Sequence, residues 1–383
     1  MEVFMSLKIK HRILFFSMPV LRIVTFFLLL SLGNIYCIAF AEKEEAMSTL
    51  AESKVKKIHR EYLDKIVIDK LEFYSSQYPD ISFVVFDSAA NVDRNMQLLS
   101  QVIGQNPIPL DYEHPDDLRK KLLLATLKRI EFLLSMNAGS STLFKSGKGA
   151  MAKRQYVCIV TIDPWATAKD NRTATYDLLD FEDSELTAIS PADYLDYVSH
   201  LRFTLDHEVY HCLDSLYNGP IPMSQLAYWG SYHMRKNELG ADAFATIMNI
   251  GDHGGVIPYM QTLRNIRGLT LLTDDPNHYS YQAIGAALKM EPEELVQSNV
   301  RERFNYATSI CERVVGTYDE HVRYTNAAYY ATKQLGRQAE ATGLSKENLD
   351  YDQVRTLVME TRNAYYNLTG REIPPARFDE ILD

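Results

Sequence analysis

The sequence predicts an α+β protein that is predominantly helical, with a small sheet in its N-terminal part. Two short apolar runs, ISFVVF at 81–86 and YVCIVTI at 156–162, have the length and the β-branched content of strands. Beyond residue 250, apolar residues recur every three or four positions, which is the period of an amphipathic helix. The clearest such stripe joins Val300, Phe304, Ala307, Ile310 and Val314, and Gly316 closes it. Strands therefore come first, and helices fill the second half of the chain.

The first 41 residues have the pattern of a signal peptide. Lys8, Lys10 and Arg12 give a positive start, and a mostly apolar core follows from Ile23 to Leu32. Ala39-Phe40-Ala41 matches the small-x-small pattern of a cleavage site. We expect cleavage after Ala41 and export to the periplasm or the medium, with no stable membrane insertion afterwards. The alternative is an uncleaved anchor, although the apolar run is short for a span of about 20 residues.

Length and charge limit the remaining possibilities. The chain has 383 residues, enough for two subdomains with cores of their own, which we expect at 42–219 and 220–383. Its formal net charge is −10, and the segment to be removed is basic. A chain this acidic is not expected to bind nucleic acid or an anionic membrane surface.

A long helix is expected between residues 190 and 218. Ser190-Pro191 offers an N-cap residue followed by proline at the first helical position. An apolar stripe follows, and Asn218-Gly219-Pro220 is a typical helix stop. The stripe consists of Leu195, Val198, Leu201, Leu205 and Val209.

Inside this helix lies the run HEVYH, residues 207–211, which has the spacing of a metal site. His207 and His211 lie one turn apart on one helix face, so both imidazoles can reach the same zinc ion. Glu208 can then act as general base on the water that the metal activates. Asp214 is a formal candidate for the third ligand, but the ordinary role of a charged residue near a helix end is favoured.

The better third ligand is Glu238, in the run RKNELGADAFATIMNI. Asp242 follows at i+4 on the same face, where it can accept a hydrogen bond from a ligand histidine and fix its tautomer. Gly240 and Ala241 are small, so this helix can approach the HEVYH helix closely. Alternatively, both carboxylates belong to a solvated helix face.

HEVYH followed by ELGAD resembles the gluzincin group of zinc metallopeptidases, which pair HExxH with a downstream glutamate in ExxxD or ExxAD form. The resemblance covers about residues 195–250. It implies that His207, His211 and Glu238 hold one zinc ion, that Glu208 is the base and that Asp242 supports a ligand histidine. The metzincin pattern does not fit, because Asp214 and Tyr217 stand where it requires glycine and histidine.

The resemblance also implies a zincin-like fold, in which a sheet precedes the active-site helix and a helical part carries the third ligand. In such peptidases an edge strand lies beside that helix and pairs with an extended substrate. The run at 156–162 is the candidate edge strand, and an ordinary internal strand is the alternative. The small-residue stretch SMNAGSSTLFKSGKGAM is expected to be a flexible linker, and Ser345 is expected to cap the last helical region.

The segment DDPNHYSYQAI, residues 274–284, contains candidate hydrogen-bond donors for the developing oxyanion. In gluzincins a downstream His or Tyr commonly has this role, so the candidates are His278, Tyr279 and Tyr281. The alternative is a turn capped by Asn277 that presents these side chains at the surface.

Three cysteines remain after cleavage, which allows at most one disulfide bond. Cys158–Cys311 is the pairing considered, and Cys212 is expected to be a small buried apolar group.

Together these features predict an exported zinc metallopeptidase that hydrolyses a peptide or protein substrate. One alternative is a zinc amidase or endopeptidase that acts on cell-wall peptides. Another is an exported protein that binds metal without catalysis.

Overall fold

The computed structural model describes residues 65–87, 138–145, 155–162, 195–218, 223–273, 275–337, 339 and 349–373. All of them belong to one compact unit, Arg60–Asp383. The expected signal peptide at 1–41 lies outside the described residues, and so does the expected subdomain boundary at 219. Both stay predictions.

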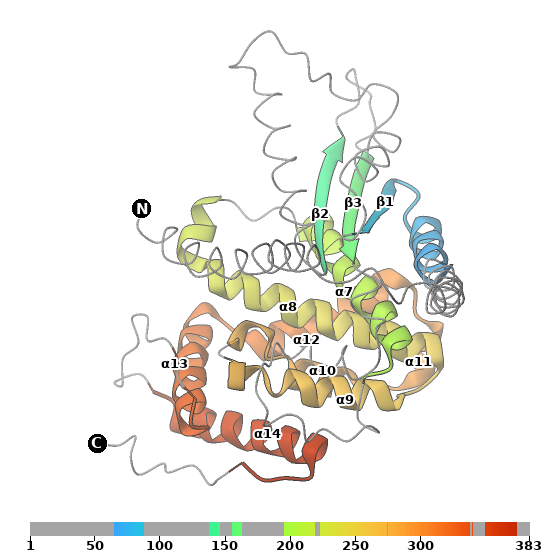
Figure 1. Ribbon diagram of the computed structural model, residues 1–383. Helices are drawn as coiled ribbons and strands as arrows, with labels where there is room; N and C mark the ends of the chain where they lie inside the picture. Colours follow the sequence, from blue (N-terminus) through green and yellow to red (C-terminus); the bar gives the residue numbers. More distant parts are fainter. Residues whose placement is uncertain are drawn as a thin grey trace, which may run out of the picture. The chain divides into compact units, whose positions relative to one another are not determined.

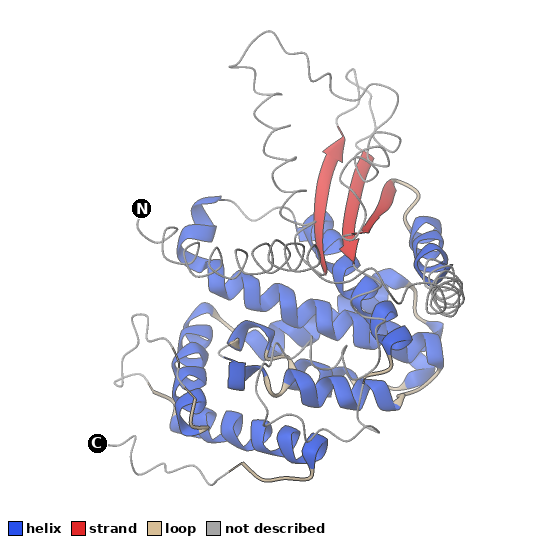
Figure 2. Ribbon diagram, viewed as in Figure 1, coloured by secondary structure: helices blue, strands red, loops and turns tan. Residues whose placement is uncertain are grey.

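The described part of the chain is predominantly helical, as the sequence predicts (Figures 1 and 2). None of these helices is long and apolar enough to cross a membrane. In order, a helix over 65–77 precedes α7 (Tyr197–Asn218), α8 (Met223–His253), α9 (Pro258–Arg267), the 3-10 turns η3 (Thr270–Thr273) and η4 (Pro276–His278), α10 (Tyr281–Ala287), α11 (Pro292–Gln297), α12 (Val300–Val315), α13 (Tyr318–Gln334) and α14 (Tyr351–Thr369).

Three strands form a sheet with the order β1-β3-β2, namely β1 (Ile81–Asp87), β3 (Gln155–Ile162) and β2 (Ala138–Lys145). β1 pairs with β3 in parallel, with Ile81 opposite Tyr156, and β2 pairs with β3 antiparallel, with Ala138 opposite Ile162. β3 is thus internal among the described strands, so of the two alternatives for 156–162 the internal strand is confirmed and the edge strand is not.

β2 also corrects the prediction of a flexible linker, because residues 138–145 are a strand. The segment begins Ala-Gly-Ser-Ser and lacks the β-branched run by which a strand is recognised. Its pairing with β3 supplies backbone hydrogen bonds that do not depend on side-chain type. The tertiary partner, not local propensity, therefore determines the strand.

Helix α7 begins later than the sequence predicts. Residues 195 and 196 are not helical, and the Oδ2 atom of Asp196 accepts a hydrogen bond from the backbone N–H of Ser199 at 2.9 Å. Asp196 is therefore the N-cap, and the predicted start at Ser190-Pro191 is wrong. Leu195 is fully buried although it precedes the helix, and Leu201, Leu205 and Val209 of the predicted stripe are buried within it.

Helices α7 and α8 pack closely along the segment that carries both sequence motifs. A Cβ atom built at Gly240 would overlap the side chain of Tyr210, so this contact requires glycine. Ala241 is fully buried. The expectation that small residues here allow close approach is confirmed. The ring of Tyr210 also stacks on Phe304 of α12, with 5.1 Å between centroids.

A disulfide bond joins Cys158 of β3 to Cys212 of α7. The considered pairing Cys158–Cys311 is therefore wrong, and so is the packing role expected for Cys212. Cys311 is a buried free thiol on α12, and its Sγ lies 3.0 Å from the backbone oxygen of Lys236. The correct pair forms because β3 lies against α7. The disulfide fixes α7 to the sheet immediately after His211.

The later helices have well-defined ends. Asn299 and Glu302 form a capping box at the start of α12, and Thr317 and Glu320 form another at α13. The stripe predicted from Val300 is confirmed as α12, which Gly316 ends with a φ of 67°. Asp350 caps α14, so the last described helix is not capped by Ser345.

Candidate metal centre

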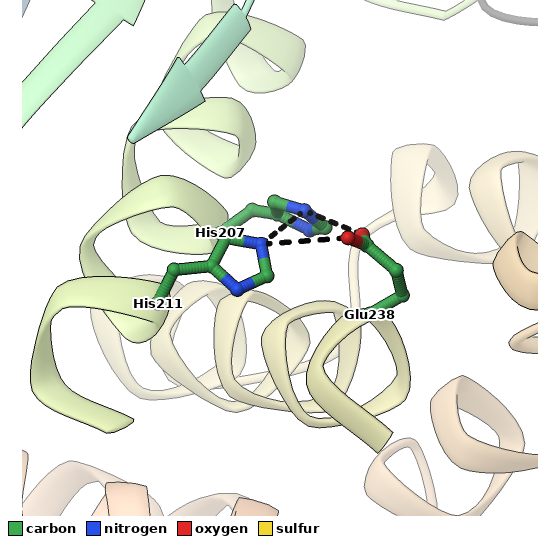
Figure 3. Close-up of side chains that lie close together, drawn as sticks. All are labelled: His207, His211 and Glu238. Atoms are coloured by element: carbon green, nitrogen blue, oxygen red, sulfur yellow. Dashed lines mark hydrogen bonds and ion pairs between the residues drawn. The ribbon is translucent and has the colours of Figure 1, made fainter. Parts of the chain in front are cut away.

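Three side chains converge between α7 and α8 (Figure 3). His207 and His211 come from one face of α7, and Glu238 faces them from α8. The Nε2 atoms of the two histidines are 3.3 Å apart. The carboxylate of Glu238 lies 3.2 Å from Nε2 of His207 and 3.8 Å from Nε2 of His211. The structure thus brings together all three ligands that the sequence predicts.

The separation of these atoms fits a small tetrahedral ion. Ligand atoms about 2.0–2.1 Å from a tetrahedral zinc ion are about 3.3–3.4 Å from one another. The observed 3.2–3.8 Å is close to that spacing. Two imidazoles and one carboxylate are also the ligand set of known catalytic zinc sites, which leave a fourth position open.

Asp242 orients the first of these histidines. Its Oδ1 atom lies 2.8 Å from Nδ1 of His207, and both side chains are buried. When Nδ1–H donates to this carboxylate, the lone pair of the ring is on Nε2, the atom that faces Glu238. The predicted supporting role of Asp242 therefore agrees with its position.

Two residues that the sequence did not indicate hold Asp242 in place. Arg267 of α9 contacts both carboxylate oxygens, Oδ1 at 3.1 Å and Oδ2 at 2.8 Å. The hydroxyl of Ser280 also donates to Oδ2. Burial raises the pKa of Asp242, but the charge of Arg267 and the hydrogen bonds from His207 and Ser280 outweigh it and hold the pKa well below its usual range. Asp242 therefore stays ionised while buried.

The charges of the cluster stabilise one another. Burial raises the pKa of Glu238, but the neighbouring His211, His207 and His278 lower it well below its usual value. Burial lowers the pKa of His207, but its hydrogen bonds to Asp242 and Glu238 raise it to about 10. The donor set therefore carries a proton that a metal ion would displace on binding.

His278 is the only one of the three oxyanion candidates that lies at this cluster among the described residues. Its Nε2 atom lies 3.4 Å from Oε2 of Glu238, and its Nδ1 atom lies 2.6 Å from Oδ2 of Asp275. Asp275 also caps η4 by accepting from the backbone N–H of His278. The turn is thus capped by Asp275 and not by Asn277, and it presents a partly exposed imidazole at the metal centre.

The two tyrosines considered with His278 point elsewhere. Tyr279 is buried, and its hydroxyl donates to Glu360 of α14 at 2.9 Å. Tyr281 begins α10, and its ring contacts the guanidinium of Arg264 at 3.9 Å. Tyr279 thus joins the end of the η4 turn to α14, and Tyr281 packs α10 against α9.

The remaining residues of the motif lie as expected on α7. Glu208 is buried, with 6% of its surface exposed, beside the first ligand histidine. Asp214 accepts a hydrogen bond from Asn218 at 2.6 Å and is not part of the three-residue cluster.

A buried ion pair fixes α7 just before the motif. Both carboxylate oxygens of Asp206 contact Nζ of Lys70, at 3.0 and 2.9 Å, and the hydroxyl of Tyr74 donates to Oδ1 at 2.7 Å. Asp206 is fully buried, and Lys70 also contacts Asp252 near the end of α8 at 2.8 Å. The helix over 65–77 therefore anchors both metal-site helices, a role that nothing local in its sequence marks.

Comparison with known proteins gives no relative for this arrangement: no protein-family model, curated protein or solved structure matches the chain.

Proposed function

We propose that this chain is an exported zinc metallopeptidase that hydrolyses peptide bonds. The observation that carries the proposal is the convergence of His207, His211 and Glu238 with the atom spacing of a tetrahedral zinc site. The proposal also rests on Glu208, because a purely structural metal site has no need of a buried carboxylate beside its first ligand.

Zinc, when bound, supplies Lewis acidity that polarises a carbonyl and acidifies a water molecule. Glu208 would take up a proton from the attacking water and pass it to the leaving amine. Asp242 and Arg267 keep His207 in the tautomer that leaves Nε2 free for the metal.

His278 is proposed as the group that stabilises the oxyanion. It is partly exposed and lies next to the Glu238 carboxylate, and Asp275 orients its ring through Nδ1. An N–H on Nε2 can then donate to negative charge that develops beside the metal.

Export is proposed from the N-terminal segment, and the Cys158–Cys212 bond agrees with it. Structural disulfides form and persist in oxidising compartments and are rare in the cytosol of most organisms.

The test is metal analysis joined to an activity screen with Glu208→Gln. We expect about one zinc ion per chain in both wild type and variant, and a loss of turnover of about 10²-fold or more in the variant. Asp214→Asn, which changes a carboxylate on the same helix outside the cluster, should keep both zinc and activity. Full activity in Glu208→Gln would exclude this mechanism.

The substrate screen separates the remaining possibilities. Protein and peptide substrates are offered beside purified cell-wall fragments, each with Glu208→Gln as background. Hydrolysis of cell-wall peptides alone would replace the proposed substrate class with a cell-wall one. Zinc binding without hydrolysis of either set would contradict catalysis.

A further inference from the structure

Arg235 is a buried cation whose charge has no carboxylate partner among the described residues. It lies on α8, one turn before Glu238, and only 2% of its surface is exposed. Its Nε and Nη1 atoms are both buried, and neither has a hydrogen-bond partner. The nearby acidic side chain on α8, Glu238, is already engaged by the histidines of the metal centre.

Among the described residues, the compensation around this guanidinium comes from one aromatic side chain, Tyr324. Its Cζ atom lies 3.4 Å from the centre of the Tyr324 ring on α13. A cation–π contact of this kind stabilises a desolvated cation only modestly. Removing an unpaired charge from water costs more than that, even after the protein relaxes. The ring alone therefore does not balance the burial of Arg235.

A second residue with an unpaired nitrogen lies close by. His321 of α13 is 3% exposed, and its Nδ1 atom has no hydrogen-bond partner, while Nε2 lies 3.1 Å from the hydroxyl of Ser231. Burial first and the charge of Arg235 second lower the pKa of His321 to about 4, so the ring is neutral at pH 7. When Ser231 donates to Nε2, the ring proton is on Nδ1 and is a further unused donor.

We propose that Arg235 is the centre of a buried binding site for a small monovalent anion, with His321 beside it. The anion supplies a negative charge directly at the guanidinium, where the described side chains form no ion pair, and it accepts from the unpartnered N–H groups of Arg235 and His321. Because Arg235 is almost completely buried, the ligand that we propose is a small ion such as chloride or formate and not a bulky carboxylate.

The site is connected to the turn that carries His278. The hydroxyl of Tyr324, the ring under Arg235, donates to the backbone oxygen of Pro276 at 3.0 Å. The ring of His321 also stacks against Tyr324, with centroids 6.4 Å apart. An anion at Arg235 therefore stabilises the packing of α13 on α8 and on η4.

Thermal unfolding at constant ionic strength tests the site without any substrate. The wild-type protein is prepared in sodium gluconate, and gluconate is then replaced by chloride or by formate at equal concentration. Because a ligand that binds only the folded state raises its stability, we expect chloride, formate or both to raise the unfolding midpoint by about 3–8 °C. Equal midpoints in all three salts would overturn the proposal.

Arg235→Met removes the charge and keeps most of the length of the side chain, so its midpoint should be the same in all three salts. Arg264→Met is the matched control, because Arg264 also stacks on a tyrosine ring but donates to the backbone oxygen of Tyr281 at 3.3 Å. This control should keep the wild-type response. A response that persists in Arg235→Met would contradict the site.

A direct measurement covers the case in which Arg235→Met does not fold. Wild-type crystals soaked in bromide should show an anomalous peak within hydrogen-bond distance of the Arg235 guanidinium, and absence of a peak there contradicts the proposal. Neither readout depends on zinc or on hydrolysis, so this inference can fail while the proposed function holds.

Discussion

The Oδ1 atom of Asp242 lies 2.8 Å from Nδ1 of His207, and Nε2 of the same ring lies 3.2 Å from Glu238. One imidazole thus connects the carboxylate that orients it to the carboxylate that would share a metal ion with it. Both carboxylates come from α8, one turn apart. Asp242 and Glu238 are therefore held at a fixed distance from each other by the same helix.

Asp242→Asn should weaken zinc binding by about 10–100-fold, because the amide no longer fixes the charge and the tautomer that His207 needs. Competition with a chromogenic chelator measures the change in the dissociation constant. Asp214→Asn serves as the control with unchanged affinity. The same variant leaves Arg267 buried without its carboxylate, so its free energy of unfolding should also fall. An unaltered zinc affinity would remove Asp242 from its supporting role.

Reduction of the Cys158–Cys212 bond should lower the free energy of unfolding by about 2–4 kcal/mol, because the reduced chain gains entropy when it unfolds. Urea unfolding with and without a reductant measures the difference. Cys311→Ala should keep the full response to the reductant, since Cys311 is not in the bond. Peptide mapping that recovered a 158–311 linkage would refute the pairing.

Acid should destabilise the protein through two buried histidines. Burial, together with the charge of Arg267 or Arg235, lowers the pKa of His200 and of His321 to about 4. Both pKa values lie below that of the unfolded chain, about 6.5, so the unfolded state binds protons first as the pH falls. The contribution of these neutral histidines to the free energy of unfolding is complete above pH 6.5 and is lost between pH 6.5 and about 4.

Each histidine should contribute a slope of about 1.4 kcal/mol per pH unit in that window. His321→Asn should therefore lose stability less steeply than the wild type between pH 6.5 and 4, and His200→Asn likewise. Urea unfolding of metal-free protein at a series of pH values gives the slopes. If the free energy of unfolding of the wild type and of both variants fell with the same slope against pH, neither histidine would be kept neutral in the folded protein.

The two histidines could be predicted as candidate metal ligands because their signal is local. His211 follows His207 at i+4, and helical geometry turns this spacing into proximity without knowledge of the rest of the fold. Glu238 could be predicted because it lies far enough beyond His211 for a loop and a return helix, with Asp242 at i+4 on the same face. Arg267 and Ser280 could not be found in this way, because they reach Asp242 from 25 and 38 residues further along the chain.

The errors in the fold have the same origin. The strand at 138–145 forms because it pairs with β3, and the disulfide forms because β3 lies against α7. No local sequence pattern predicts either of these tertiary contacts. The start of α7 was misplaced because Ser190-Pro191 and Asp196 are both acceptable caps. Local sequence rules allow both helix starts, and the tertiary structure determines which one forms.

The matched spacing of the two pairs, His207 with His211 on α7 and Glu238 with Asp242 on α8, has a mechanical consequence. The members of each pair are four residues apart, about 6 Å along the helix axis, so the bonds between the two pairs form together at one axial register of the two helices. A slide of α7 along α8 by a fraction of a turn breaks the contact to Glu238 and the contact to Asp242 at once. The affinity for a metal ion held by these side chains would therefore depend on the register of the two helices.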